Sequence, residues 1–156
     1  MTELKPILLV EDDIVDMMTV KRALRDLNIT NDLVHRENGE EALQYLNNES
    51  NAKPGIILLD LNMPKMNGIE FLKTIQTDNR LNKIPVVVLT TSKAQNDITE
   101  SFKYGAAGYV IKYIDYEKSV KTIEAIVLSW INNEKKQDGE INNGQYQIQD
   151  TSYRGQ

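Results

Sequence analysis

Ile56-Ile57-Leu58-Leu59-Asp60-Leu61-Asn62 is the stretch that decides the fold, because four aliphatic residues run without a polar break directly into an aspartate. A short aliphatic run of this kind is typical of a strand that is buried on both faces of a parallel sheet. In open α/β sheets, ligands bind beyond the carboxyl ends of the strands. The stretch therefore predicts a buried strand followed by a candidate functional carboxylate, Asp60.

Further short apolar runs flank this stretch on both sides. They are Ile7–Val10, Leu33–Arg36, Val86–Leu89 and Tyr109–Ile111. The second run is mixed with polar residues and fits an edge strand. The longer segments that follow the runs repeat apolar residues at helical spacing, with Asp13 as a candidate N-cap and Asn67-Gly68 as a turn. The alternation predicts a doubly wound α/β fold, with a five-stranded parallel sheet and helices on both faces.

Length and composition exclude several classes of protein. The 156 residues favour one compact domain, and a net charge of −5 argues against binding of a nucleic acid backbone. The absence of cysteine excludes disulfide scaffolds, thiolate zinc sites and cysteine nucleophiles. The apolar runs are too short to span a membrane, and the N-terminus lacks the features of a signal peptide. We therefore expect a soluble cytoplasmic protein that binds neither nucleic acid nor membrane.

The composition changes near Asn133. Residues 134–156 contain few large apolar side chains and are rich in Asn, Gln, Gly and charged residues of both signs. Such a segment cannot bury enough surface to offset the entropy lost on ordering. We expect a folded domain over residues 1–133 and a polar C-terminal tail over residues 134–156 that is disordered or only weakly docked.

Charged and hydroxyl side chains follow several of the predicted strands. Glu11 and Asp12 follow the first, Asp60 the third, Thr90 the fourth and Lys112 the fifth. Each of them alone is explained by a turn, a helix cap or a solvated side chain. Together they form an acidic cluster that favours a hard cation such as Mg²⁺. A carboxylate in this setting can accept a phosphoryl group, while the cation, a hydroxyl and an ammonium neutralise the phosphoryl oxygens.

Four motifs in order resemble the response-regulator receiver domains of two-component signalling. They are Ile7–Asp12, Ile57–Gly68, Pro85–Ser92 and Gly105–Lys112. The similarity runs from about Pro6 to Asn132. The stretch Leu89–Ala94 and the long first loop are similar to the stand-alone regulators paired with phytochromes. The resemblance implies a flavodoxin-like sheet of order 2-1-3-4-5 with five helices.

The resemblance also implies a phosphoacceptor and a metal site. Asp60 occupies the position of the phosphoacceptor. Asp12 and Asp60 would bind Mg²⁺ directly, together with the backbone carbonyl of Asn62, and Glu11 would act through a bound water. Catalysis of the chain's own phosphorylation would rest on Asp60, Thr90 and Lys112.

The family's switch maps onto Thr90, which would hydrogen-bond the phosphoryl group, and Tyr109, which would turn inward. One position departs from the family, which usually has Pro after the strand-five lysine, often with a cis peptide bond. Here the residue is Tyr113, and a cis bond costs roughly 0.5–1 kcal/mol before Pro but about 2.5–4 kcal/mol before other residues. We therefore expect a trans bond between Lys112 and Tyr113.

The resemblance implies a signalling protein rather than an enzyme. Its partners would be a sensor histidine kinase or phosphotransfer protein, and a downstream protein that the sequence does not identify. A homodimer through helix four, strand five and helix five is a further expectation. One alternative is a receiver-like binding module that is not phosphorylated. Another is a phosphatase of the haloacid-dehalogenase type, which needs a second Asp where this chain has Asn62.

Two other site types are set aside. Dinucleotide binding lacks its glycine-rich turn after the first strand. His35, the only histidine, is interpreted as a surface or hydrogen-bonded residue rather than as a phosphodonor or ligand.

Overall fold

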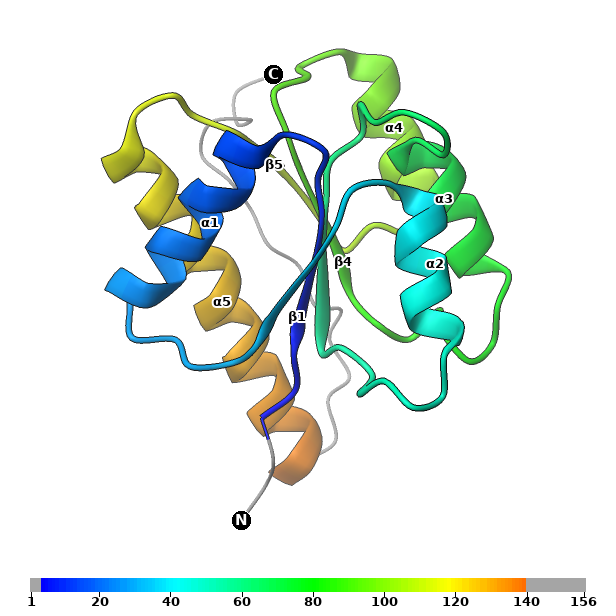
Figure 1. Ribbon diagram of the computed structural model, residues 1–156, viewed down its shortest axis with the longest axis horizontal. Coiled ribbons are helices and arrows are strands. Elements are labelled where there is room, and N and C mark those ends of the chain that lie inside the picture. The colour runs from blue at the N-terminus through cyan, green and yellow to red at the C-terminus, as the bar shows by residue number, and fades with distance from the viewer. Residues whose placement is uncertain (1–3, 140–156) are drawn as a thin grey trace.

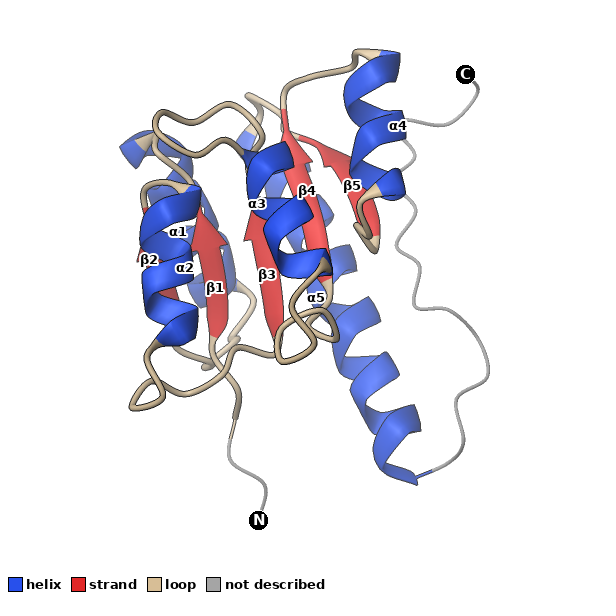
Figure 2. Cartoon of the chain, turned by 90° about the vertical axis from the view of Figure 1, so that its right-hand side faces the viewer, coloured by secondary structure: helices blue, strands red, loops and turns tan. Residues whose placement is uncertain are grey.

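Each of the five apolar runs forms a strand in the computed structural model, which describes residues 4–139. The strands are all parallel, and their order is β2-β1-β3-β4-β5 (Figure 2). Their bounds are β1 (Ile7–Val10), β2 (Leu33–Arg36), β3 (Ile56–Leu59), β4 (Val86–Thr90) and β5 (Gly108–Ile111). This arrangement confirms the predicted flavodoxin-like fold, including β2 as a half-buried edge strand.

Helices cover both faces of the sheet (Figure 1). Helices α1 and α5 lie on one face, and α2, α3 and α4 lie on the other. Their bounds are α1 (Ile14–Asp26), α2 (Gly39–Asn47), α3 (Gly68–Gln76), α4 (Gln95–Lys103) and α5 (Tyr116–Gly139). In the described part of the chain, no helix is both long enough and apolar enough to cross a membrane.

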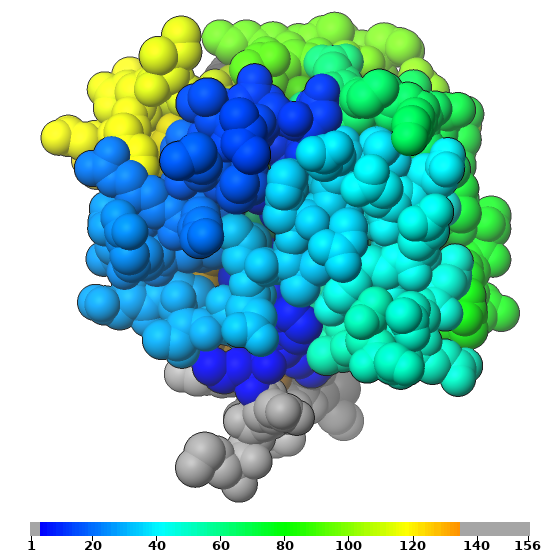
Figure 3. Space-filling view, in the orientation of Figure 1, coloured from blue at the N-terminus to red at the C-terminus, as the bar shows by residue number. Residues whose placement is uncertain are grey.

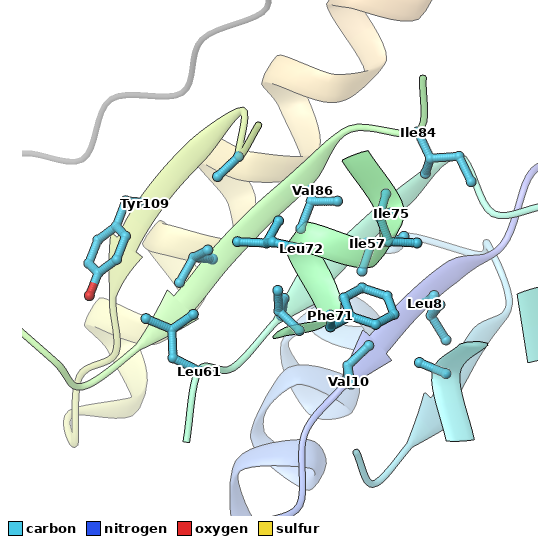
Figure 4. Packing of buried hydrophobic residues seen from close by; sticks show 14 of the residues in the cluster. Leu8, Val10, Ile57, Leu61, Phe71, Leu72, Ile75, Ile84, Val86 and Tyr109 are labelled. Atoms are coloured by element: carbon cyan, nitrogen blue, oxygen red, sulfur yellow. The ribbon is translucent and has the colours of Figure 1, made fainter. Parts of the chain in front are cut away.

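The central strands divide their side chains between two hydrophobic clusters, since successive residues of a strand point to opposite faces. On β1, Leu8 and Val10 pack under α2 and α3, whereas Ile7 and Leu9 pack under α1 and α5. All four are at most 1% exposed. Figure 4 shows the first cluster, in which Phe71 of α3 lies over β1 and β3. Burying one such aliphatic side chain stabilises the fold by about 1.5–3 kcal/mol.

Two helix starts lie beside the carboxyl edge of the sheet. Asp13 caps α1 as predicted, because its Oδ1 accepts hydrogen bonds from the backbone of Val15 and Asp16 at 2.8 and 3.0 Å. Asn67, expected in a turn, is the N-cap of α3 and forms a capping box with Glu70. The following Gly68 is required because a Cβ there would lie 2.5 Å from the carbonyl oxygen of Asp60. The start of α3 is thereby fixed against the end of β3.

Helix α5 is longer than the sequence predicted. It continues through Gly139, so 134–139 are helical rather than part of a disordered tail, and Lys5 contacts Glu134 at 3.3 Å. The rest of the expected tail, 140–156, lies outside the described residues. All peptide bonds of the described residues are trans, which confirms the expectation for Lys112 and Tyr113.

Candidate functional site

Three carboxylates meet at the carboxyl edge of the sheet. Glu11 and Asp12 follow β1, Asp60 follows β3, and one oxygen from each lies within 4.8 Å of the others. The register brings them together, because β1 and β3 are neighbours and Val10 pairs with Leu59. Glu11 and Asp60 are buried while Asp12 is exposed, so the cluster opens to solvent on one side.

Asp60 is held in place by backbone contacts on both sides. Its N–H donates to the carbonyl of Val10 at 3.0 Å, and its Oδ1 accepts from the N–H of Leu61 at 2.9 Å. Gly68 packs so closely against the backbone of Asp60 and Leu61 that a Cβ at position 68 would clash with both. The second oxygen, Oδ2, is turned towards Lys112.

Lys112 follows β5 and reaches back over the edge of the sheet to the acidic residues. Its Nζ lies 2.6 Å from Glu11, 2.8 Å from Asp16 and 3.6 Å from Asp60, and its side chain is only 13% exposed. Burial alone would lower the pKa of Lys112, but the hydrogen bonds to Asp16 and Glu11 outweigh it and raise the pKa above its usual value. The site therefore contains a permanent cation directed at the carboxylates.

Glu11 is buried, and its carboxylate contacts both Lys112 and the backbone of Asp13. Burial raises the pKa of its carboxyl group to about 7; the hydrogen bond from Lys112 opposes this rise and the charge of Asp60 adds to it. Its second oxygen accepts a hydrogen bond from the N–H of Asp13 at 3.2 Å. One ammonium thus leaves the buried carboxylates short of positive charge, so the all-oxygen cluster fits a hard divalent cation such as Mg²⁺.

Thr90 and Tyr109 lie on neighbouring strands beside this cluster. Thr90 is the last residue of β4 and is fully buried, and its Oγ1 accepts a 3.4 Å hydrogen bond from the N–H of Ser92. Tyr109 of β5 is 2% exposed, and its hydroxyl donates to the carbonyl of Ser92 at 2.8 Å. The ring is therefore already inward in this structure, and both side chains contact the same loop after β4.

Two residues named from the sequence have simpler surroundings. Asn62 follows Asp60 by two positions, and its side chain is exposed in the loop before α3. His35 is half-buried, and its Nε2 contacts the carbonyl oxygen of Glu11 at 2.6 Å, so the ring helps to fix the loop after β1. This agrees with a hydrogen-bonded, structural histidine.

Asp16 is the residue of this site that the sequence did not indicate. It lies in the first turn of α1, where an acidic residue is common because it favours the positive end of the helix dipole. It lies three residues after the N-cap Asp13, and the packing of α1 against the sheet brings it into contact with Lys112 at the end of β5.

Comparison with known proteins places this geometry in a family. The model of the response regulator receiver domain matches residues 7–124. Among curated proteins, response regulator Rcp1 of Synechocystis is 35% identical over 81% of this chain and 89% of its own length. A probable methanogenesis regulatory protein of Methanothrix harundinacea, FilR2, is 38% identical over 80% and 83%, respectively.

Solved structures agree with this assignment. The phosphorylated cyanobacterial phytochrome response regulator RcpA superposes with a TM-score of 0.78 at 34% identity, covering 84% of this chain and 96% of RcpA. The Mn²⁺-bound form of Rcp1 gives a TM-score of 0.75 at 35% identity, covering 81% and 94%. With a family match over most of its length and an acidic edge to its sheet, the chain belongs to the response regulator receiver domains of two-component signalling, and it is similar to phytochrome response regulators.

Proposed function

We propose that Asp60 accepts a phosphoryl group from a sensor histidine kinase or phosphotransfer protein, in a step that requires Mg²⁺. The observation that carries the proposal is the position of the Asp60 carboxylate, which lies beside the Glu11 and Asp12 carboxylates and 3.6 Å from the Lys112 ammonium. Two relatives support it, since similar proteins have been solved phosphorylated and with Mn²⁺ bound.

The residues of the chain divide the chemistry between them. An oxygen of Asp60 forms the new bond to phosphorus as the bond from phosphorus to the donor breaks. Lys112 and Thr90 supply an ammonium and a hydroxyl to the phosphoryl oxygens. When bound, Mg²⁺ would neutralise further charge on these oxygens. We assign its direct ligands to Asp12, Asp60 and the carbonyl of Asn62, and a water-mediated role to Glu11.

The signal would pass through Thr90 and Tyr109. A phosphoryl group adds nearly two negative charges, enough to draw the Thr90 hydroxyl towards Asp60. That movement removes the acceptor of the Ser92 N–H, so the loop after β4 must rearrange. Because the Tyr109 hydroxyl is bonded to the same loop, we propose that phosphorylation selects one arrangement of loop and ring together.

The surface around Lys112 suits a protein donor. Exposed apolar side chains gather on the first half of α1 and on the β5–α5 loop, at Ile14, Val15, Met18 and Ile114. Figure 3 shows these two segments on the same side of the molecule, in dark blue and yellow. Since they border Lys112, whose side chain is 13% exposed and faces Asp60, we propose that the phosphodonor docks here.

The output would use α4, β5 and α5. We propose this face as the contact with a downstream protein or with a second copy, and sizing with and without beryllofluoride distinguishes the two. Charged residues of both signs lie on it and could pair across a two-fold axis: Asp97, Glu100, Lys103, Lys118, Lys121 and Glu124.

The test of phosphoacceptance is incubation with acetyl phosphate and Mg²⁺ followed by intact mass. The wild type should gain about 80 Da, and Asp60→Asn should gain nothing. Asp78→Asn, at the opposite edge of the sheet, is the matched control and should be labelled normally. Labelling of Asp60→Asn, or labelling that survives chelation, would reject the proposal.

Labelling with acetyl phosphate and an assay with phosphomonoesters test the two alternative functions. A receiver-like module that is not phosphorylated would show no mass gain in the wild type. A phosphatase would release phosphate repeatedly from small phosphomonoesters. We expect no such turnover, because this chain has Asn62 where those enzymes have a second aspartate.

The switch has its own test. Phosphorylated Thr90→Ala should bind its partner no better than the unphosphorylated protein.

A further inference from the structure

Asp16 places a carboxylate where the proposed function does not require one. Its Oδ2 lies 2.8 Å from Lys112 Nζ, and Glu11 lies 2.6 Å from the same nitrogen. Charge-assisted hydrogen bonds of this kind span about 2.7–2.9 Å, so the 3.6 Å from Lys112 to Asp60 is too long for one. Of the three carboxylates that Lys112 approaches, the proposed phosphoacceptor Asp60 is thus the one to which it does not donate a hydrogen bond.

The position of Asp16 is set by the helix. Its backbone N–H is bound by the side chain of Asp13 at 3.0 Å, and its carboxylate lies near the positive end of the α1 dipole. The side chain is 40% exposed, so water can stabilise the Asp16 carboxylate when it is not paired with Lys112. Asp16 therefore offers Lys112 a fixed alternative to Asp60.

We propose that Asp16 is a positioning residue that competes with the phosphoryl group on Asp60 for Lys112 and so weakens the phosphorylated state. The proposal rests on the proposed function, because it assumes that Asp60 carries the phosphoryl group. An ammonium has three N–H donors, and two of them are held by Glu11 and Asp16. To bring Nζ closer to Asp60, Lys112 must move against the attraction of both.

Asp16→Asn tests the competition, because the amide keeps the size of the side chain and removes its charge. The quantity to measure is the equilibrium affinity for beryllofluoride, a phosphoryl analogue, in the presence of Mg²⁺, by calorimetry. Asp16→Asn should bind about 3- to 10-fold more tightly than the wild type, the range expected for removing one charge at this separation in a partly exposed site. Asp16→Glu, which keeps the charge, should stay within about 2-fold.

Asp13→Asn is the matched control, since it removes a negative charge from the same edge but preserves an N-cap acceptor. Its side chain is exposed and bonds to the backbone of α1, not to Lys112. We expect its affinity for beryllofluoride to stay within about 2-fold of the wild type, because exposed charges are screened.

A double-mutant cycle separates competition from simple repulsion. In a Lys112→Gln background, Asp16→Asn should give no gain in affinity, whereas an undiminished gain would mean direct repulsion and overturn the proposal. Weaker binding by Asp16→Asn would make Asp16 a support for Lys112 and overturn it too. A wild type that binds no beryllofluoride would instead refute the proposed function itself.

A second measurement needs neither the metal ion nor the Lys112→Gln variant. In the metal-free protein, the side-chain amino resonance of Lys112 should shift in Asp16→Asn and remain in place in Asp13→Asn. An unchanged resonance in Asp16→Asn would show that the 2.8 Å contact does not hold Lys112 in solution, and would also overturn the proposal.

Discussion

Lys112 and Arg80 lie at opposite edges of the sheet, and both contact carboxylates, yet their surroundings differ. Arg80, in the loop before β4, bonds Asp78 at 2.7 Å with a side chain that is 58% exposed. Lys112, after β5, has a side chain that is 13% exposed and has three carboxylates within 3.6 Å. One edge thus has a single pair with a solvated arginine, and the other has several carboxylates around a largely buried lysine.

The difference shows how burial changes the energetic cost of losing a charge. An exposed pair is screened by water and contributes little to stability, so its loss leaves no strain. In a buried cluster the cost of desolvation is recovered only while each charge keeps a partner. The carboxyl edge is therefore sensitive to any event that adds or removes charge, including binding of a cation or a phosphoryl group.

Removal of Lys112 should have the largest effect on stability. Lys112→Met leaves Glu11 buried without its cation, and we expect the free energy of unfolding of the metal-free protein to fall by about 2–4 kcal/mol at pH 7.5. Urea denaturation measures this, with Arg80→Met as the control. Equal losses in the two variants would remove the distinction between the edges.

A pH series should show the next largest effect. Burial raises the pKa of Glu11 from 4.5 to about 7, so the folded protein holds this proton more tightly than the unfolded chain does. Metal-free wild type should therefore lose stability relative to Glu11→Gln as the pH rises from about 4.5 to about 7, by at most about 3 kcal/mol. Parallel stability curves for the two proteins would contradict this.

Mg²⁺ should stabilise the carboxyl edge by a smaller amount. An ion that binds only the folded state, at ten times its dissociation constant, adds about 1.4 kcal/mol. The thermal midpoint should rise with Mg²⁺ but not with Na⁺ at equal ionic strength, and Asp12→Asn should reduce the rise. An undiminished rise in that variant would place the ion elsewhere.

Arg80→Ala should have the smallest effect. Because the Arg80 side chain is 58% exposed, water screens its pairing with Asp78, and we expect the thermal midpoint to stay within about 1 °C of the wild type, with no change in the response to Mg²⁺. A calorimetric scan checks this. A drop comparable to that of Lys112→Met would show that the amino edge also depends on its ion pair.

The strands could be predicted from aliphatic runs because those runs report burial. The predicted and observed bounds of β1, β2 and β3 are identical, but β4 and β5 are each one residue longer than predicted. The additional residues, Thr90 and Gly108, join the ladder through backbone pairing with Ile111 and Val87. Backbone pairing does not depend on an aliphatic side chain, so the runs could not reveal it.

The candidate site was predictable where it depends on strand order and not where it depends on helix packing. Glu11, Asp60 and Lys112 follow strands, so their meeting follows from the topology. Asp16 lies on a helix, and its partner depends on how α1 rotates against the sheet. The inward position of Tyr109 depends likewise on the loop after β4, whose conformation no local pattern specifies.

The length of α5 determines where a label or a surface can be attached without blocking the carboxyl edge of the sheet. This helix begins four residues after Lys112 and ends at Gly139, so at 1.5 Å per residue its 24 residues span about 36 Å. Figure 2 shows that it runs past the amino edge of the sheet, away from the ends of the strands where the carboxylates lie. A dye, a biosensor surface or a fused reporter at the end of α5 would therefore leave the approach to Asp60 open.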